Sequence, residues 1–187
     1  FGLIKLYCVK QGMRLFIAID IPPWITRAMD SVQHQLPPET DGVRRVKLDN
    51  MHITLKFLGE VKKQKVQAIA SRLDELSYRK FDVPVKGIGG FPSEEYVRVI
   101  WAECRGKEIA GLADKISKAF PEFPAEPFSG HLTIARVLRK ADLRKFFAEH
   151  KDARFGNFKV EKFYLMQSEL SSSGPKYSVL AEYQLKE

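Results

Sequence analysis

The sequence predicts an α+β fold with two pseudo-symmetric lobes of mainly antiparallel sheet, outer helices and a central cleft between the lobes. One observation is that short apolar or alternating runs, typical of strands, are interleaved with amphipathic runs typical of helices. Another is that each half of the chain contains a strand-like run with the same polar pair, His52-Ile53-Thr54 and His131-Leu132-Thr133. Because identity between the halves is almost confined to these two units, the duplication is inferred from pattern alone.

In the first half, strands are expected at residues 14–20, 43–48 and 51–58, and helices at 24–36 and 62–77. A Pro-Pro pair closes the first strand, and Gly59 is expected to end the third. Segment 62–77 is the clearest helix, because Ile69, Leu73 and Leu76 recur at helical intervals with charged residues between them.

In the second half, strands are expected at residues 81–88, 96–104, 131–138, 158–168 and 177–185, and helices at 107–120 and 141–150. The stretch 89–95 contains glycine and proline and predicts the turn of a hairpin between the first two of these strands. Ile109, Leu112 and Ile116 mark the apolar face of the first helix. A Ser-Gly-Pro run at 171–175 predicts a turn before the last strand.

The length and composition of the chain predict an ordinary folded protein. It has 187 residues, of which 44% are hydrophobic, enough to bury a sizeable core. Residues 13–187 are expected to form a single two-lobed domain. Residues 1–12 precede Met13, which opens the first strand like a natural start, and they are expected to be an N-terminal extension or an artefact of expression.

The formal net charge of +8 favours a polyanionic partner such as nucleic acid, although many proteins of similar charge bind none. Basic residues are spread along the chain, with a modest enrichment just before the first His-containing segment and just after the second. The enriched positions are Arg44, Arg45 and Lys47, and Arg136, Arg139, Lys140, Arg144 and Lys145.

The two cysteines, Cys8 and Cys104, are too few for a disulfide framework, so a reducing compartment and a cytoplasmic location are expected. Neither cysteine is expected to be catalytic. No run approaches the roughly 18 apolar residues of a membrane span, and the first residues lack the pattern of a cleavable signal. No membrane association is expected.

The repeated His-x-Thr unit presents an imidazole and a hydroxyl on one face of a strand, because residues i and i+2 point to the same side. Two imidazoles at one substrate group are able to act as base and acid in the same turnover, since histidine titrates near neutral pH. In-line attack at phosphorus needs such groups on opposite sides, and hydroxyls stabilise the non-bridging oxygens. The candidates are His52 and His131 for catalysis and Thr54 and Thr133 for phosphate binding.

Other interpretations of these residues stay open. A single His-x-Thr unit is at least as often a half-buried strand pair that is hydrogen-bonded within the protein. A metal site would need three or four ligands, and the sequence has no Cys pair, no His-Glu-x-x-His run and no third histidine near the motifs. We therefore expect no metal. His34 and His150 are expected to be surface residues on helices, without a functional role.

Five segments resemble those of a known family: HITLKFLG, HLTIARV, the opening RLFIAIDIP, the middle FPSEEYVRVIWAE and the end SELSSSGPKYSVL. On these segments, which span nearly everything after Met13, the chain resembles the 2H phosphoesterases, and among them the RNA 2′,3′-cyclic phosphodiesterases, also called 2′-5′ RNA ligases. The resemblance implies a two-lobed antiparallel fold with a basic cleft. It also implies metal-independent opening of a terminal 2′,3′-cyclic phosphate to a 2′-phosphate, and a reverse reaction that joins RNA ends.

By position, the resemblance implies His52 as the acid that protonates the departing 3′ oxygen and His131 as the base that activates water. The division of these two roles stays open. Thr54 and Thr133 would hold the phosphate.

The resemblance further implies that Phe57 and Arg136, each five residues after a His, contact the terminal nucleotide. Strict strand alternation points both away from the His face, so a twist, a bulge or a strand end is required. Core packing for Phe57 and a solvated charge for Arg136 are the alternatives. Lys56 has the parity of His52 and is predicted to contact the phosphate backbone. Tyr177 is expected to line the cleft without being catalytic.

The expected partners are RNA or oligonucleotide ends, tRNA fragments among them, and the protein is expected to be a monomer that needs no cofactor. A second hypothesis keeps the enzyme but replaces RNA by a small cyclic nucleotide or an ADP-ribose cyclic phosphate. A third hypothesis, from a different class, is a non-catalytic RNA-binding subunit. Two matched imidazoles argue against it, because a binder needs positive charge and stacking surfaces only.

Overall fold

Nine strands form one antiparallel sheet in the computed structural model, which describes residues 12–171 and 174–187. The strands are β1 (Gly12–Asp20), β2 (Val43–Arg45), β3 (His52–Lys62), β4 (Phe81–Pro92), β5 (Val97–Glu103), β6 (His131–Val137), β7 (Arg154–Val160), β8 (Lys162–Ser171) and β9 (Gly174–Gln184). Their order is β7-β4-β5-β6-β3-β1-β8-β9, and β2 pairs with β6 off this path. Cys8, most of the expected N-terminal extension, and residues 172–173 of the expected turn lie outside the described residues.

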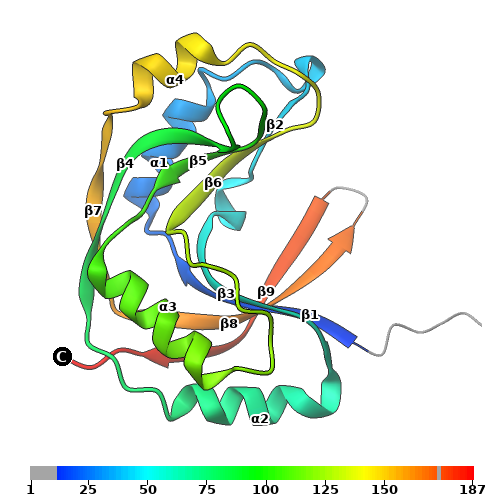
Figure 1. Cartoon of the computed structure of the whole chain (residues 1–187), viewed down its shortest axis with the longest axis vertical. Helices are drawn as coiled ribbons and strands as arrows, with labels where there is room; N and C mark the ends of the chain where they lie inside the picture. The colour runs from blue at the N-terminus through cyan, green and yellow to red at the C-terminus, as the bar shows by residue number, and fades with distance from the viewer. Residues whose placement is uncertain (1–11, 172–173) are drawn as a thin grey trace, which may run out of the picture.

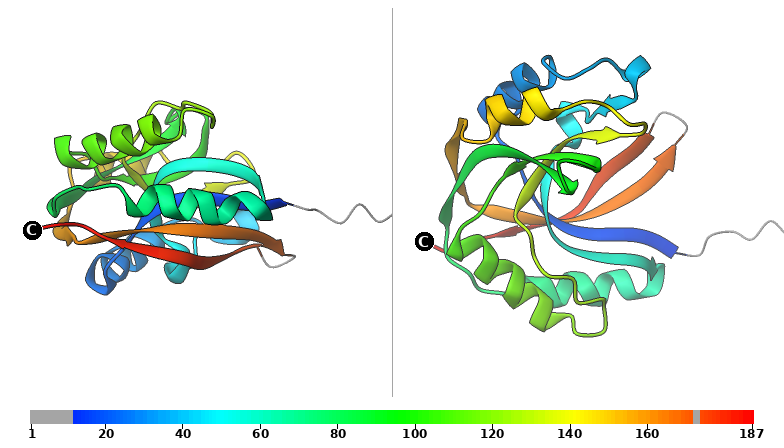
Figure 2. Two further views of the ribbon diagram at one scale, coloured as in Figure 1. Left: turned by 90° about the horizontal axis from the view of Figure 1, so that it is seen from below. Right: turned by 45° about the horizontal axis from the view of Figure 1, so that its top comes forward.

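The sheet consists of two four-stranded halves that meet at one ladder pair. One half contains β7, β4, β5 and β6, and the other contains β3, β1, β8 and β9. At the junction, Ile53 of β3 faces Leu132 of β6, and both residues are 0% exposed. Figure 2 shows β1, β8 and β9 side by side in the second half. The predicted α+β fold with two pseudo-symmetric lobes is confirmed.

The helices pack against both halves of the sheet, and not always against the half that contains the preceding strand. Within the described residues they are α1 (Pro23–Gln33), α2 (Lys63–Asp74), α3 (Lys107–Ala119) and α4 (Arg144–His150), with short 3₁₀ turns at Glu39–Asp41 and Leu48–Asn50. Helix α1 follows β1 along the chain but contacts β6 and β7 of the other half, whereas α3 follows β5 and contacts β3 of the other half as well as β4 of its own. Figure 1 shows α1 and α4 beside one half and α2 and α3 beside the other. Each half of the sheet is therefore partly covered by a helix that follows a strand of the other half.

The two motif strands contain the same irregularity at the same position. In β3, Thr54 pairs with Ala18 and Lys56 with Ile17 of β1, so Leu55 is an extra residue. In β6, Thr133 pairs with Trp101 and Ala135 with Ile100 of β5, so Ile134 is the extra residue. The burial pattern is identical over the first seven residues of both strands. A bulge of this kind inverts the parity of the residues that follow it.

This bulge is what the sequence requires if Phe57 and Arg136 are to lie on the same face as the histidines. Both are exposed, whereas their preceding neighbours, Lys56 and Ala135, are buried on the opposite face. The expectation of a bulge is confirmed. The expectation that Lys56 shares the face of His52 is wrong, because it assumed unbroken alternation.

The segment 158–168 was expected to form one strand. It is instead divided between β7 and β8 at Glu161. Strand β7 pairs with β4 in one half and β8 pairs with β1 in the other, so the chain crosses between the halves here. The break coincides with a change of parity, since the buried residues Phe158 and Val160 are followed by Phe163 rather than by residue 162.

Gly59 does not end β3, which continues to Lys62. It has a positive φ of 69° and lies at a second register shift, where Leu15 pairs with Gly59 and Phe16 pairs with Phe57. Glycine adopts this conformation at little cost, so the strand bends here and keeps its partner.

His150 is buried (8% exposed) and is not the surface residue that the sequence predicted. Helix α4 begins at Arg144 rather than at residue 141, and Phe146, Phe147 and His150 share its buried face. The His150 ring lies 4.6 Å from the Phe146 ring, and its Nδ1 is 2.9 Å from the Phe146 carbonyl oxygen. His34 is exposed, as expected.

The junction between the halves predicts a stability effect. Replacing Leu132 by Ala removes apolar contacts at the one ladder pair that joins β3 to β6, and we expect it to lower the free energy of unfolding by about 2–5 kcal/mol. The control is Leu170→Ala, at a position that is 72% exposed, with an expected change within about 0.5 kcal/mol. Urea denaturation measures both, and equal effects would contradict the role given to the junction.

Candidate active site

Four polar side chains of the two motifs come together at the junction. The pair of Ile53 with Leu132 sets an antiparallel register, in which Thr54 and His131 are the next opposing positions on one side. His52 and Thr133 are the opposing positions on the other side. All four residues are half-buried, whereas Ile53 and Leu132 between them are fully buried on the other face. Each histidine therefore lies across from the threonine of the other motif, on the face of the sheet that we call the open face.

Both imidazoles are held in the same tautomer by the backbone. His52 Nδ1 is 2.8 Å from the Asn50 carbonyl oxygen, and His131 Nδ1 is 2.6 Å from the Ser129 carbonyl oxygen. A carbonyl only accepts hydrogen bonds, so Nδ1 carries the proton in each ring and donates it. The Nε2 atom of each neutral ring is then left with its lone pair, which is the arrangement required for proton transfer.

Burial lowers the pKa of both histidines below the ordinary value. For His52, burial is the largest cause; the Asn50 carbonyl and Asp20 raise its pKa, while His131 and Arg136 lower it. For His131, burial again dominates, the Ser129 carbonyl raises the pKa and Arg136 lowers it. Both rings are therefore neutral near pH 7 in the free protein. A positive charge on His131 opposes protonation of His52, so the pair does not easily carry two charges.

Each histidine ring lies nearly perpendicular to one aromatic ring, and His52 also contacts the ring of Phe16. Tyr177 of β9 lies 5.0 Å from His52 at an interplanar angle of 89°, and Phe91 of β4 lies 5.1 Å from His131 at the same angle. Phe91 in turn packs 4.9 Å from Trp101, whose ring occupies the space that a Cβ at Gly89 would need. No local pattern pointed to Phe91, because only the sheet order brings β4 near β6. Tyr177 lines the site, as expected.

A carboxylate lies opposite each histidine on the adjacent strand, β1 or β5, but the two carboxylates have different partners. Asp20 pairs with His52 and Glu103 pairs with His131 in the strand register. Asp20 raises the pKa of His52. Glu103 instead forms ion pairs with Lys86 (3.6 Å) and Arg105 (3.2 Å). The two histidines are thus alike in tautomer but different in electrostatic surroundings.

Phe57 and Arg136 flank the four polar side chains on the open face. The Phe57 ring is 50% exposed and lies 6.2 Å from the Phe16 ring, which is 4.9 Å from His52. Burial lowers the pKa of both imidazoles and raises the pKa of Tyr177; the guanidinium of Arg136 adds to the lowering at the imidazoles and opposes the rise at Tyr177. Its positive charge therefore acts directly on the site.

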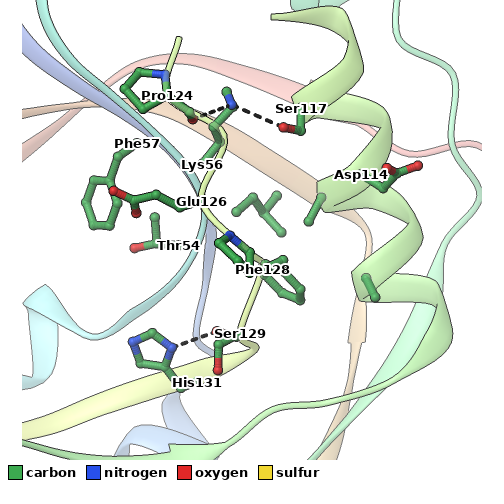
Figure 3. A pocket seen from close by; sticks show the side chains of 14 residues that line it. Thr54, Lys56, Phe57, Asp114, Ser117, Pro124, Glu126, Phe128, Ser129 and His131 are labelled. Carbon is green, nitrogen blue, oxygen red and sulfur yellow. Dashed lines mark hydrogen bonds between the residues drawn. The ribbon is translucent and has the colours of Figure 1, made fainter. Parts of the chain in front are cut away.

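Lys56 lies on the other face and holds a loop. Its side chain is 7% exposed, and Nζ donates hydrogen bonds to Ser117 Oγ (3.2 Å) and to the Pro124 carbonyl (3.0 Å). Figure 3 shows these two bonds above the site, with His131 bonded to Ser129 below. The loop between α3 and β6 thus connects Lys56 to the residue that orients His131, a role that the sequence did not predict.

A pocket of about 310 Å³ opens beside the histidine of the second motif. Both motif strands line it, β3 through residues 54–57, Lys56 included, and β6 through His131, together with α3 and the loop before β6. Glu126 and Phe57 both line this pocket, and both are labelled in Figure 3. The space is sufficient for part of a nucleotide next to the proposed phosphate position.

Other candidate groups among the described residues lie away from this chemistry. Cys104 is fully buried, and burial raises the pKa of its thiol to about 12, so the thiol is inert near neutral pH. Within residues 12–171 and 174–187, no cluster of three or more His, Cys, Asp or Glu side chains is placed to hold a metal ion. In the same residues, no helix combines the length and the apolar character needed to cross a bilayer.

Curated proteins similar to this chain share one name. The chain matches the family model described as "LigT like Phosphoesterase" over residues 19–101, a range that contains His52. It is 35% identical over 177 residues to the "RNA 2',3'-cyclic phosphodiesterase" of Methanocaldococcus jannaschii, which covers 91% of this chain and 100% of that relative. It is 32% identical over 177 residues to the protein of the same name from Archaeoglobus fulgidus, over 92% of this chain and 100% of that relative.

Solved structures show the same relationship. A crystal structure of a protein from Thermus thermophilus has a TM-score of 0.80 at 30% identity and covers 93% of this chain and 98% of that chain. The crystal structure of E. coli LigT complexed with 3'-AMP has a TM-score of 0.78 at 25% identity and covers 94% of this chain and 99% of that chain. The resemblance inferred from the sequence motifs is confirmed: the chain belongs to the LigT-like phosphoesterase family.

Proposed function

We propose that this protein hydrolyses the terminal 2′,3′-cyclic phosphate of RNA to a 2′-phosphate by acid–base catalysis that requires no metal. The observation that carries the proposal is the pair of imidazoles on opposing strands, each with Nδ1 bound to the backbone and Nε2 left for proton transfer. The name of the curated relatives and the 3'-AMP bound to E. coli LigT support RNA as the substrate class.

The mechanism follows from in-line attack at phosphorus. His131 Nε2 takes a proton from water as the oxygen attacks the phosphorus, and protonated His52 gives its Nε2 proton to the departing 3′ oxygen. The bond to the 3′ oxygen breaks and the 2′-phosphate remains. Asp20, which favours the protonated form of His52, supports this division of roles, since the carboxylate opposite His131 is bound to Lys86 and Arg105.

The remaining site residues bind the substrate in this proposal. The hydroxyls of Thr54 and Thr133 donate hydrogen bonds to the non-bridging oxygens, where negative charge must be stabilised in the transition state. The exposed ring of Phe57 stacks on the terminal base, and Arg136 contacts the same nucleotide. With the 5′-hydroxyl of a second RNA attacking the phosphorus in place of water, and the 3′ oxygen leaving as before, the same groups would form a 2′-5′ linkage. We propose that the substrates are RNA ends, those of tRNA fragments included, and that the protein acts as a monomer.

Replacing either histidine by alanine should lower kcat on an RNA with a 2′,3′-cyclic end by about 10²–10⁴-fold, because each supplies one of the two proton transfers. Binding of the product-like 2′-phosphate RNA should change much less. Single-turnover assays with product analysis measure the rate, in wild-type enzyme treated with chelator and in both variants.

The matched control is His34→Ala, which removes an exposed imidazole and should leave kcat unchanged. Near-wild-type kcat in either His52→Ala or His131→Ala would refute the two-histidine mechanism. A 3′-phosphate product would refute the proposed direction of ring opening.

The pH profile should be shifted to the acidic side. The base must be neutral, so activity rises with pH through its pKa; the acid must be protonated, so activity falls with pH through its pKa. Because burial lowers the pKa of both histidines in the free enzyme, kcat/KM should reach its maximum below pH 6.5.

The profile of kcat should differ from that of kcat/KM. The bound phosphate is negative and raises the pKa of the acid, so the falling limb of kcat should lie at higher pH. Initial rates between about pH 4 and 9 at constant ionic strength measure both profiles. A kcat/KM profile that is flat, or that has its maximum well above pH 6.5, would contradict the assignment of both limbs to buried histidines.

A further inference from the structure

Two arginines from distant parts of the chain lie directly opposite each other on the open face. Strand β2 pairs with β6, and in this register Arg44 faces Arg136 while Val43 faces Val137. Both valines are buried, at 1% and 4% exposure, so the alternate positions point to the other side. The two basic clusters noted in the sequence are thus brought together by this strand pair.

The arginine pair continues the row of site residues. The same edge of β6 pairs with β3 at Leu132 and with β2 at residues 135–137. The sheet therefore forks here, with β3 and β2 as its two branches. Along β6 the open face carries His131, Thr133 and then Arg136, whose charge reaches both imidazoles. Arg44 is the next positive charge beyond Arg136, on the strand that leads into the first motif.

Neighbouring arginines of this region donate hydrogen bonds to backbone carbonyls, whereas Arg44 pairs with an exposed carboxylate. Arg45 donates to the Leu36 carbonyl (3.3 Å), and Arg139 donates to the Thr40 carbonyl. Arg44 forms an ion pair with Glu39 at 2.6 Å, with side-chain exposures of 56% and 62%. An ion pair this exposed contributes little and exchanges readily for another anion. Like charges directly opposite each other in a sheet are destabilising, which a phosphate between them would reverse.

We propose that Arg44, together with Arg136, binds the backbone phosphate of the RNA strand next to its terminal nucleotide. The guanidinium groups match the oxygens of a phosphodiester, and this second contact makes an oligonucleotide a better substrate than a cyclic mononucleotide. The inference rests on the proposed function, because it concerns the RNA chain whose cyclic phosphate end occupies the proposed active site.

The test compares a nucleoside 2′,3′-cyclic phosphate with a dinucleotide that ends in the same cyclic phosphate. Arg44→Gln should lower the ratio of kcat/KM for the dinucleotide to that for the mononucleotide by about tenfold. The matched control is Arg144→Gln at the first residue of α4, which removes the same charge from an equally short ion pair, with Asp142 at 2.6 Å. The control should leave the ratio unchanged. An unchanged ratio in Arg44→Gln, or an equal fall in Arg144→Gln, would overturn the proposal.

A binding measurement separates this inference from the proposed function. The affinity for an oligonucleotide that ends in a 2′-phosphate should fall with salt, and Arg44→Gln should make the slope of log K against log[salt] shallower by about 0.7. Because no turnover is needed, wild-type protein that hydrolyses neither substrate would refute the proposed function and leave this measurement valid. Equal slopes in wild type and Arg44→Gln would refute the phosphate contact.

Discussion

The structure depends on one antiparallel contact, between two strands that carry the same bulge. The contact of Ile53 with Leu132 fixes which residues oppose one another, and it places each histidine across from the threonine of the other motif. The bulges at Leu55 and Ile134 then return Phe57 and Arg136 to the same face. Everything proposed for the site follows from these two geometric constraints. The proposed role of the duplicated motif depends on the strands meeting at this register.

Burial lowers the pKa of both histidines, and backbone hydrogen bonds fix the tautomer of both rings. Partial desolvation disfavours the protonated form of both rings, and a positive charge on His131 further disfavours protonation of His52. The carbonyls of Asn50 and Ser129 fix the rings without satisfying Nε2. A bound phosphate supplies the negative charge that allows one ring to take up a proton. Substrate and proton are therefore expected to bind together, and the proximity of Asp20 to His52 favours His52 as the ring that takes up the proton.

Local sequence patterns predicted the elements and the motif residues, because both depend on near neighbours. The helix at 62–77 follows from apolar spacing, and His52-x-Thr54 follows from strand alternation. The same alternation failed for Lys56, because the bulge that inverts its parity is set by pairing with β1. The burial of His150 was missed because its position at the end of the helix favoured exposure, although it shares the buried face of Phe146 and Phe147.

Contacts between distant strands had no local signal. Phe91 meets His131 only because β4 and β6 flank β5, and the facing of Arg44 and Arg136 depends on the fork of the sheet. Sequence reasoning found both basic clusters but not that they adjoin. The carbonyls that set the tautomers were also invisible, since any residue at positions 50 and 129 offers one.

The most direct test of the two-histidine site is a crystal structure of the protein with a nucleoside 2′-phosphate, the product of the proposed reaction. We expect the Nε2 atoms of His52 and His131 to lie about 3 Å from different oxygens of one phosphate, with the hydroxyls of Thr54 and Thr133 on the remaining oxygens. A phosphate bound by only one imidazole, or bound away from the junction of β3 and β6, would contradict this site.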